Sequence, residues 1–197
     1  TVLVARSSNG ETMAYPVEEI AAQEQTHLPD RRFAPAELSP SVSDQAQHIA
    51  IRAINALSGI GVFSIELLLT ESDELLVNKV VPRIQNVAQL TAAACVTDPF
   101  EQHLRAILGL PLGSTRQHSA AVLFSLGSSP ESATGVTTKG LAGALSVDET
   151  CVHLYHKQQN TGLAAVGHIT VLDQQLAHAK DKAQRVKDSL KSPSGSD

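Results

Sequence analysis

The chain has 197 residues, 42% of them apolar, which is enough to bury the core of one or two compact domains. A formal net charge of −5 and a content of no Trp, two Tyr and four Phe provide neither a basic field nor stacking rings, so we expect no nucleic-acid partner. No apolar run approaches the roughly 18 residues that span a bilayer, and the first residues lack the zones of a signal peptide, so we expect no membrane association and a cytoplasmic location.

Strand and helix patterns alternate through the first half of the chain. Alternating apolar positions bounded by turn residues predict strands, and apolar residues spaced three and four apart predict a helix behind a capping serine. The turn 7–10 joins two of the strands and the turn 70–74 joins two others, so two hairpins are expected. The predicted elements are strands 1–6 and 12–17, a loop over 29–40, a helix from Ser41 or Ser43 to about Leu57, and strands 62–69 and 75–81.

The second half shifts towards short strands and small-residue loops. A helix is predicted from about Phe100 to Leu108, because Gly109 and Pro111 follow it as stop signals. The later elements are strands 120–126, 152–155 and 168–172, a Gly/Ser/Thr-rich loop over 127–143 and a helix from about Asp173 to Leu190. The shift predicts a first subdomain over 1–112, a small β-rich capping subdomain over 113–190 and a disordered tail over 191–197.

The second hairpin sets two opposite charges against each other. If Ser72 and Asp73 form the centre of the turn, Glu66 lies directly opposite Lys79, with the two Cβ atoms about 5 Å apart. A three-residue loop would break this pairing. By spacing alone, an ordinary cross-strand ion pair accounts for both residues, so a functional role needs a second argument.

That argument comes from a series of motifs along nearly the whole chain. They lie at residues 15–18, 61–66, 74–78, 82–83 with 86, 94–97, 100–111, 152–155 with 157, and 167–171. In this order they resemble the C-terminal half of the ATP-grasp enzyme N5-carboxyaminoimidazole ribonucleotide synthetase and the equivalent region of fungal phosphoribosylaminoimidazole carboxylase. The resemblance implies an α+β fold, with the C-terminal half of an ATP-grasp fold followed by a small β-rich C-terminal subdomain.

The resemblance also implies a reaction. In that family ATP and bicarbonate form carboxyphosphate, which carboxylates the amine of aminoimidazole ribonucleotide while magnesium holds the phosphates. Two glutamates at the positions of Glu66 and Lys79 would ligate the metal. A lysine at the second position removes a carboxylate and sets a positive charge against the cation, so we expect this metal site to fail.

Other departures from the family pattern point the same way. Two histidines of the family are replaced by Gln85 and Gln89, while Arg83 and Asn86 remain. The basic cluster that follows Lys157 in the family is absent here, which removes charge-assisted bonds to a ribonucleotide phosphate. The family's N-terminal half, with its lysines over the ATP phosphates, has no counterpart among these residues, and no G-x-x-x-x-G-K-[ST] loop occurs.

One histidine occupies an unusual position. His156 stands where the family motif has glycine, beside Lys157. A new imidazole at that place is suited to act as an acid or base near neutral pH, and it is equally well explained as a side chain in solvent.

We therefore expect a repurposed small-molecule enzyme of a specialised pathway, which uses the ancestral cleft without ATP, metal or another cofactor. If the chain is an enzyme, its chemistry would be of the isomerase, cyclase or lyase type rather than carboxylation. The candidate catalytic residues are Glu66, Lys79 and His156, and the candidate substrate-binding residues are Asn78, Arg83, Gln85, Asn86, Gln89 and Lys157; no residue is assigned to a metal.

Two alternatives stay open. The chain is alternatively a non-catalytic binding or assembly pseudoenzyme, which keeps the fold and pairs with another chain or with itself as a homodimer, because half of a larger fold exposes strand edges. The third hypothesis is a fragment of an authentic ATP-dependent phosphoribosylaminoimidazole carboxylase of purine biosynthesis. The expected partners are a small-molecule ligand and a second protein chain, most simply another copy.

Overall fold

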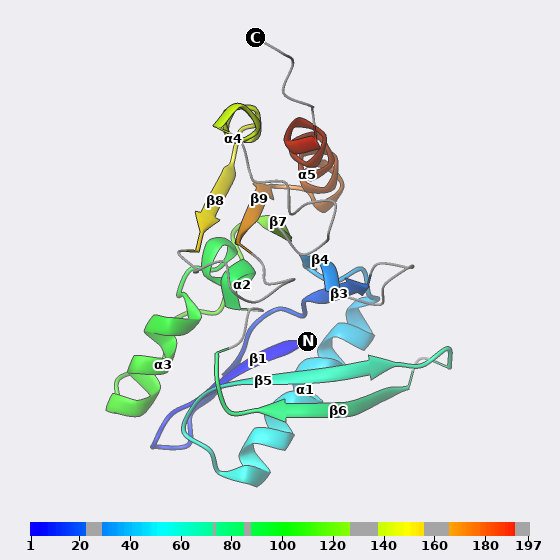
Figure 1. The fold of residues 1–197 in the computed structure, drawn as a ribbon. Coiled ribbons are helices and arrows are strands. Elements are labelled where there is room, and N and C mark those ends of the chain that lie inside the picture. Colours follow the sequence, from blue (N-terminus) through cyan, green and yellow to red (C-terminus); the bar gives the residue numbers. More distant parts are fainter. Residues whose placement is uncertain (23–28, 73, 85–87, 127–137, 156–165, 192–197) are drawn as a thin grey trace.

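The computed structural model describes residues 1–22, 29–72, 74–84, 88–126, 138–155 and 166–191. Within these ranges the chain forms two antiparallel sheets and five helices, and each sheet occupies one end of the molecule (Figure 1). The expected α+β fold class is therefore confirmed. None of the helices in the described ranges has the length and apolar character needed to cross a membrane.

The first sheet is built from two hairpins and is covered by one helix. Its strand order is β2-β1-β5-β6, formed by Thr12–Ala14, Val2–Arg6, Gly61–Leu69 and Leu75–Val81, and helix α1 spans Pro40–Leu57. The helix packs Ala46, Ala50 and Ile54 against alternate residues of the sheet, Val2, Val4, Phe63 and Ile65. These alternate positions carry apolar side chains because successive residues of a strand face opposite sides of the sheet.

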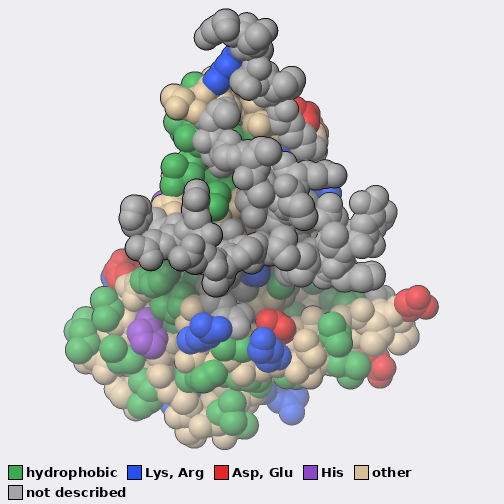
Figure 2. Space-filling model, viewed as in Figure 1, with side chains coloured by type: hydrophobic (Ala, Val, Ile, Leu, Met, Phe, Trp, Pro, Cys, Tyr) green, Lys and Arg blue, Asp and Glu red, His purple; other side chains and the backbone are tan. Residues whose placement is uncertain are grey.

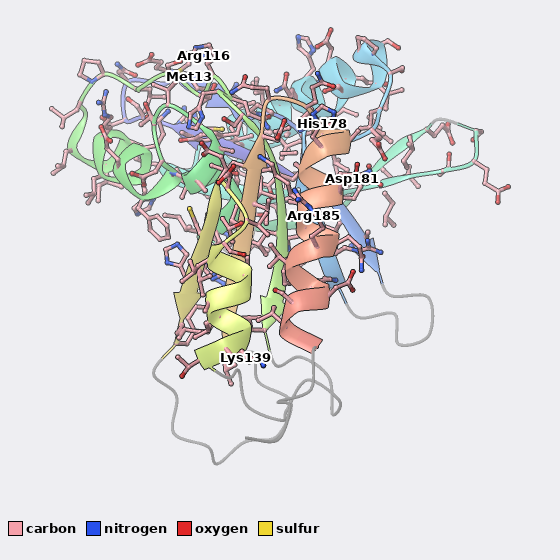
Figure 3. All side chains as sticks on the ribbon, turned by 90° about the horizontal axis from the view of Figure 1, so that it is seen from above. Met13, Arg116, Lys139, His178, Asp181 and Arg185 are labelled. Atoms are coloured by element: carbon pink, nitrogen blue, oxygen red, sulfur yellow. The ribbon has the colours of Figure 1, made fainter. Side chains whose placement is uncertain are left out.

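The second sheet takes strands from both halves of the chain. Its strand order is β3-β4-β7-β9-β8, formed by Glu19–Ala22, Pro29–Ala34, Ala120–Leu126, Gly167–Asp173 and Thr150–Leu154. Helices α4 (Thr138–Leu145) and α5 (Leu176–Lys191) lie side by side on one face of it, and the labelled residues His178, Asp181 and Arg185 follow one another along α5 (Figure 3). The sheet therefore joins residues that the proposed boundary near residue 112 would separate.

Helix α2 (Ala88–Ala94) connects the two sheets through its packing. Ala88 belongs to the buried cluster around Leu3 and Val62 of the first sheet. Leu90 and Ala94, on the same helix, are buried against strands of the second sheet. Helix α3 (Pro99–Leu108) follows it directly in the chain.

The structure contains the predicted helices and strands, with their ends shifted by a few residues, and four further elements that the sequence did not predict. Helix α1 begins earlier than predicted because Ser39, not Ser41 or Ser43, is its N-cap and accepts from the Val42 N–H. The region 29–40, predicted as a loop, contains β4, which pairs with β3, another strand that was not predicted. Helices α2 and α4 were also not predicted. Residues 192–197 of the predicted tail lie outside the described ranges.

Candidate functional site

The hairpin of β5 and β6 brings Glu66 opposite Lys79, which confirms the predicted pairing although the predicted turn is wrong. Near the tip the register differs from the predicted one by one residue: Leu67 lies opposite Val77, whereas the predicted turn would place it opposite Asn78. A β-bulge at Asn78 then adds one residue to β6 and brings Lys79 back against Glu66. The bulge thus compensates for a turn that is one residue longer than expected.

Glu66 and Lys79 form a partly exposed ion pair. The Lys79 Nζ lies 3.8 Å from Glu66 Oε1. The Lys79 side chain is 55% exposed and the Glu66 side chain is 27% exposed. At this exposure the pair contributes about 0–1 kcal/mol, so either partner can turn to a ligand at small cost. Figure 2 shows basic side chains gathered with an acidic one on the face of the molecule that carries this hairpin.

The donor set on this face does not fit a magnesium ion held between two carboxylates. Magnesium requires hard anionic oxygen ligands, and the residue directly opposite Glu66 is an ammonium group instead. Among the residues that the structure describes, no three His, Cys, Asp or Glu side chains are grouped so that they could hold a metal ion.

A pocket of about 480 Å³ opens beside the hairpin and contains two of the predicted residues, Glu66 and Asn78. Three further carboxylates line it, from Glu18, Glu19 and Glu37. The remaining lining is mainly apolar, from Val17, Ile20, Ala36, Leu38, Ala46, Leu67, Leu68, Leu69 and Leu75. The pocket therefore combines four carboxylates with a mainly apolar lining.

Two other predicted residues near the hairpin lie outside this lining. Lys79 is exposed on β6, and Arg83 is exposed just past the end of that strand. The structure therefore places Glu66, Lys79, Asn78 and Arg83 on one hairpin and its exit, but only two of them at the pocket. Their common role in binding a substrate stays a prediction.

Glu18 is a buried acid in this pocket that sequence reasoning did not single out. It is 3% exposed, and its carboxylate accepts a hydrogen bond from the Thr91 hydroxyl on α2. Burial raises the pKa of Glu18 to about 7, although the Thr91 hydrogen bond and the nearby Arg32 guanidinium both act to lower it. Among the described residues its second oxygen, Oε2, has no hydrogen-bond partner. The sequence signals were its place in the family motif at residues 15–18 and a carboxylate directly after Tyr15–Val17.

Gln89, predicted to bind substrate, takes part in a network between α2 and the second sheet. Its Nε2 donates to the Tyr155 hydroxyl at 2.7 Å, and that hydroxyl lies 2.6 Å from His168 Nδ1. The ring of His168 stacks on His153, with the centroids 4.6 Å apart. Burial, and then the nearby His153, lower the pKa of His168 to about 4, so its ring is neutral at pH 7.

Four predicted site residues lie outside the described ranges. They are Gln85, Asn86, His156 and Lys157. Their roles in binding or acid–base chemistry remain predictions.

Comparison with known proteins gives a consistent set of relatives. The model of the ATP-grasp domain matches residues 1–100. The chain is 32% identical to phosphoribosylaminoimidazole carboxylase of Ogataea methanolica, over 97% of this chain and 35% of that protein. It is 29% identical to N5-carboxyaminoimidazole ribonucleotide synthase of Brucella melitensis, over 86% of this chain and 44% of that protein.

Solved structures agree with the sequence relatives. N5-carboxyaminoimidazole ribonucleotide synthetase from Thermotoga maritima superposes with a TM-score of 0.82 at 38% identity, covering 96% of this chain and 51% of that one. The Aspergillus clavatus synthase, solved in complex with ADP and 5-aminoimidazole ribonucleotide, has a TM-score of 0.83 at 28% identity, over 96% of this chain and 50% of that one. The chain thus spans between about a third and a half of the length of these relatives.

These findings confirm the resemblance and correct the main functional hypothesis. The expectation of an ATP-independent isomerase, cyclase or lyase is wrong, because the relatives are carboxylases and synthetases and a second Aspergillus clavatus structure is complexed with ATP. A portion of an ATP-dependent carboxylase, the third hypothesis, fits the comparisons better.

Proposed function

The chain belongs to the ATP-grasp family, and we propose that it is part of an ATP-dependent carboxylase of the phosphoribosylaminoimidazole type. The observation that carries the proposal is the extent of the likeness, which covers 96% of this chain in a relative solved with ADP and 5-aminoimidazole ribonucleotide. Because the chain spans about half of that relative, the remainder of the nucleotide site would come from residues that this chain lacks.

The hairpin of β5 and β6 is the part of the site that this chain would contribute. Lys79 is 55% exposed and loses little when it leaves Glu66, so its ammonium group is available to phosphate oxygens of the nucleotide. A lysine binds phosphate as a point charge and needs no fixed fork geometry. In this proposal Lys79 neutralises phosphate charge directly at a position where the family resemblance places a metal-binding glutamate.

The replacement at residue 79 supplies the test. We expect the full chain to bind ATP in an isothermal titration and to lose about tenfold in affinity, or about 1.4 kcal/mol, in the Lys79→Ala variant. In Lys79→Glu the two-carboxylate set is restored, so ATP binding should become dependent on added magnesium. Lys139→Ala, a change at an exposed lysine on α4, serves as the matched control and should leave ATP binding unchanged.

Two outcomes would overturn the proposal. One is that ATP binds neither the natural chain nor the Lys79→Glu variant. The other is that ATP binds equally well with lysine, alanine or glutamate at residue 79.

The Glu66–Lys79 pair also favours a second candidate, a pseudoenzyme that binds a small molecule without turning it over. Such a protein would retain ATP binding but release no phosphate when 5-aminoimidazole ribonucleotide and bicarbonate are added together with the complementary half of a relative. Phosphate release under these conditions would exclude it. We further propose a cytoplasmic protein that forms homo-oligomers, which light scattering tests.

A further inference from the structure

The second sheet extends past the helices that cover it. Helix α5 packs on β7 and β9, and α4 packs on β8, whereas β4 and β3 continue the sheet on the other side of α5. Figure 3 shows α4 and the two outer strands on opposite sides of α5. A pocket of about 180 Å³, here called the corner pocket, lies between α5 and the outer strands.

The floor of the corner pocket is apolar and buried. Phe33 on β4 lies directly opposite Val122 on β7. Phe33 is 7% exposed and Val122 is 1% exposed. Ala21 of β3 and Ala183 of α5 complete the apolar lining. A ligand that places an apolar group on this floor removes that group from water, which favours binding.

The walls of the corner pocket are basic. Arg31 precedes Phe33 by two residues on β4, so it lies on the same face of the sheet, the one that α5 covers and where an apolar residue is usual. Helix α5 adds Lys180 and Lys187, which are about two turns apart and so share one face of the helix. Among the described residues, no carboxylate lines this pocket.

Two phenylalanine rings fix where the lysine ammonium groups lie. The Lys187 Nζ lies 5.0 Å from the centroid of the Phe124 ring, and the Lys180 Nζ lies 4.1 Å from that of Phe33. Both distances are within the range of a cation–π contact. Phe124 is also the residue directly opposite Arg31, so Arg31 and Lys187 meet at the same ring. These two residues form the cationic end of the corner pocket.

The other end of the pocket carries less net charge. The Lys180 Nζ lies 2.6 Å from Glu37 Oε2, and the two groups form an ion pair at the pocket's edge. The positive charge of Lys180 is therefore largely neutralised. An anionic group is attracted to the end at Arg31 and Lys187 and not to the end at Lys180.

The volume of the corner pocket limits the size of a ligand. A space of 180 Å³ corresponds to about six water molecules at the density of the liquid. Sites for larger ligands measure about 300–1,000 Å³, so a nucleotide does not fit here. One small ring or branched aliphatic group with a single acidic group does fit.

We propose that the corner pocket binds a small organic carboxylate, whose carboxylate group lies between Arg31 and Lys187 and whose apolar body lies on Phe33 and Val122. An arginine guanidinium holds a carboxylate through two parallel hydrogen bonds, and a lysine adds a point charge. This site goes beyond the proposed function, because none of the described residues that line it belongs to the β5–β6 hairpin.

Three small probes test the site on the full natural chain. Benzoate supplies a ring and a carboxylate, benzamide supplies the same ring without a charge, and inorganic phosphate supplies a charge without a ring. Benzoate should bind with a Kd of about 1 mM, which is ordinary for so few atoms, and should shift the amide resonances of Phe33 and Ala183 in an NMR titration. Benzamide and phosphate should each bind at least about tenfold more weakly, because each lacks one of the two contacts.

The same titration contains the outcomes that would overturn the proposal. Equal binding of benzamide would show that the cations are not used, and equal binding of phosphate would show that the apolar floor is not used. No binding of benzoate would exclude the site. Shifts confined to the amides of β5 and β6 would place the benzoate elsewhere and would also contradict the proposal.

Variants with one charge removed locate the carboxylate. Arg31→Gln and Lys187→Gln should each weaken benzoate binding at least about tenfold and leave the weak binding of benzamide unchanged. The matched control is Arg185→Gln, which removes the same charge from an exposed position of α5 outside the lining and should bind benzoate like the natural chain.

Circular dichroism of each variant verifies that it is folded. Because Arg31 is on β4 and Lys187 is on α5, loss of folding in one variant still leaves the other as a test. Full benzoate affinity in either folded variant would contradict the assigned place of the carboxylate. An equal loss in Arg185→Gln would show a general effect of net charge and would overturn the site.

Discussion

At the scale of single residues, Glu18 shows how the fold creates a group that the sequence does not reveal. Its carboxyl is enclosed by the chain around it and hydrogen-bonded to Thr91, which lies 73 residues away in sequence. Burial raises its pKa to about 7 from an ordinary value near 4.5. Between these two pH values the native state holds a proton that the unfolded chain has released.

The stability of the protein should therefore depend on pH through Glu18. As the pH rises from about 4.5 to about 7, the contribution of Glu18 to the free energy of unfolding should fall by about 3 kcal/mol and then level off. The lowered pKa of His168 acts in the opposite direction, adding stability as the pH rises from about 4 to about 6.5. The two trends overlap, so the total curve for the natural chain will be flatter than either alone.

Denaturant titrations of Glu18→Gln against the natural chain isolate the Glu18 trend. The difference in unfolding free energy, natural chain minus variant, should decline from pH 4.5 to 7, because glutamine does not titrate. Glu11→Gln, at an exposed position, is the control variant measured in parallel. A constant difference for Glu18→Gln over this range would contradict the buried, protonated carboxyl.

The Glu66–Lys79 pair shows the limit of local reasoning about register. The sequence correctly suggested that the two residues face each other, but it placed the turn centre at Ser72 and Asp73. In the structure the turn is one residue longer than predicted, and a bulge at Asn78 restores the register, so that Glu66 still pairs with Lys79. A bulge has no reliable local signature, because Asn is also common in turns and at exposed strand positions.

At the scale of elements, helices with clear start and stop signals could be predicted and those without could not. The helix α3 was predicted because Gly109 ends it, and its start proves equally well defined: Asp98 is the N-cap and accepts from the Phe100 and Glu101 N–H groups. Helix α2 is buried by both sheets, so it lacks the polar stripe that marks a surface helix. Helix α4 contains two glycines, which favour a loop assignment.

Strand β4 could not be predicted from the sequence for a different reason. Its sequence, Pro29–Ala34, contains a proline and three charged residues and has little intrinsic strand preference. It is held in the sheet by pairing with β3 on one side and β7 on the other. Such long-range pairing overrides the local strand preference. It cannot be detected from the sequence of a single element.

The cap of α3 gives a prediction at this scale. Asp98→Ala should lower the free energy of unfolding by about 1 kcal/mol, because two N–H groups of the first turn lose their acceptor. Asp98→Asn keeps a side-chain oxygen and should lose much less. Chemical denaturation with circular dichroism measures both, and equal losses in the two variants would show that the charge rather than the cap matters.

At the scale of the whole molecule, the chain belongs to the ATP-grasp family and spans between about a third and a half of the length of its relatives. The motifs identified the family because they are spread from residue 15 to residue 171, and the comparisons confirm it over almost the entire chain. Lys79, Gln85 and Gln89, read against the family pattern, predict an ATP-independent chemistry, and the relatives contradict that prediction. Side-chain replacements alone did not determine the function, because they concern a few positions whereas the likeness to the relatives extends over almost the whole chain.

Hydrogen exchange of the β5 and β6 amides with and without ATP tests the central claim most directly. We predict that ATP slows exchange at β6 around Lys79 and at the neighbouring β5 residues, while the amides of β8 and of α5, in the second sheet and the helix that covers it, are unchanged. No change at β6 under saturating ATP, or slowing confined to the second sheet, would contradict the assignment of this hairpin to a nucleotide site.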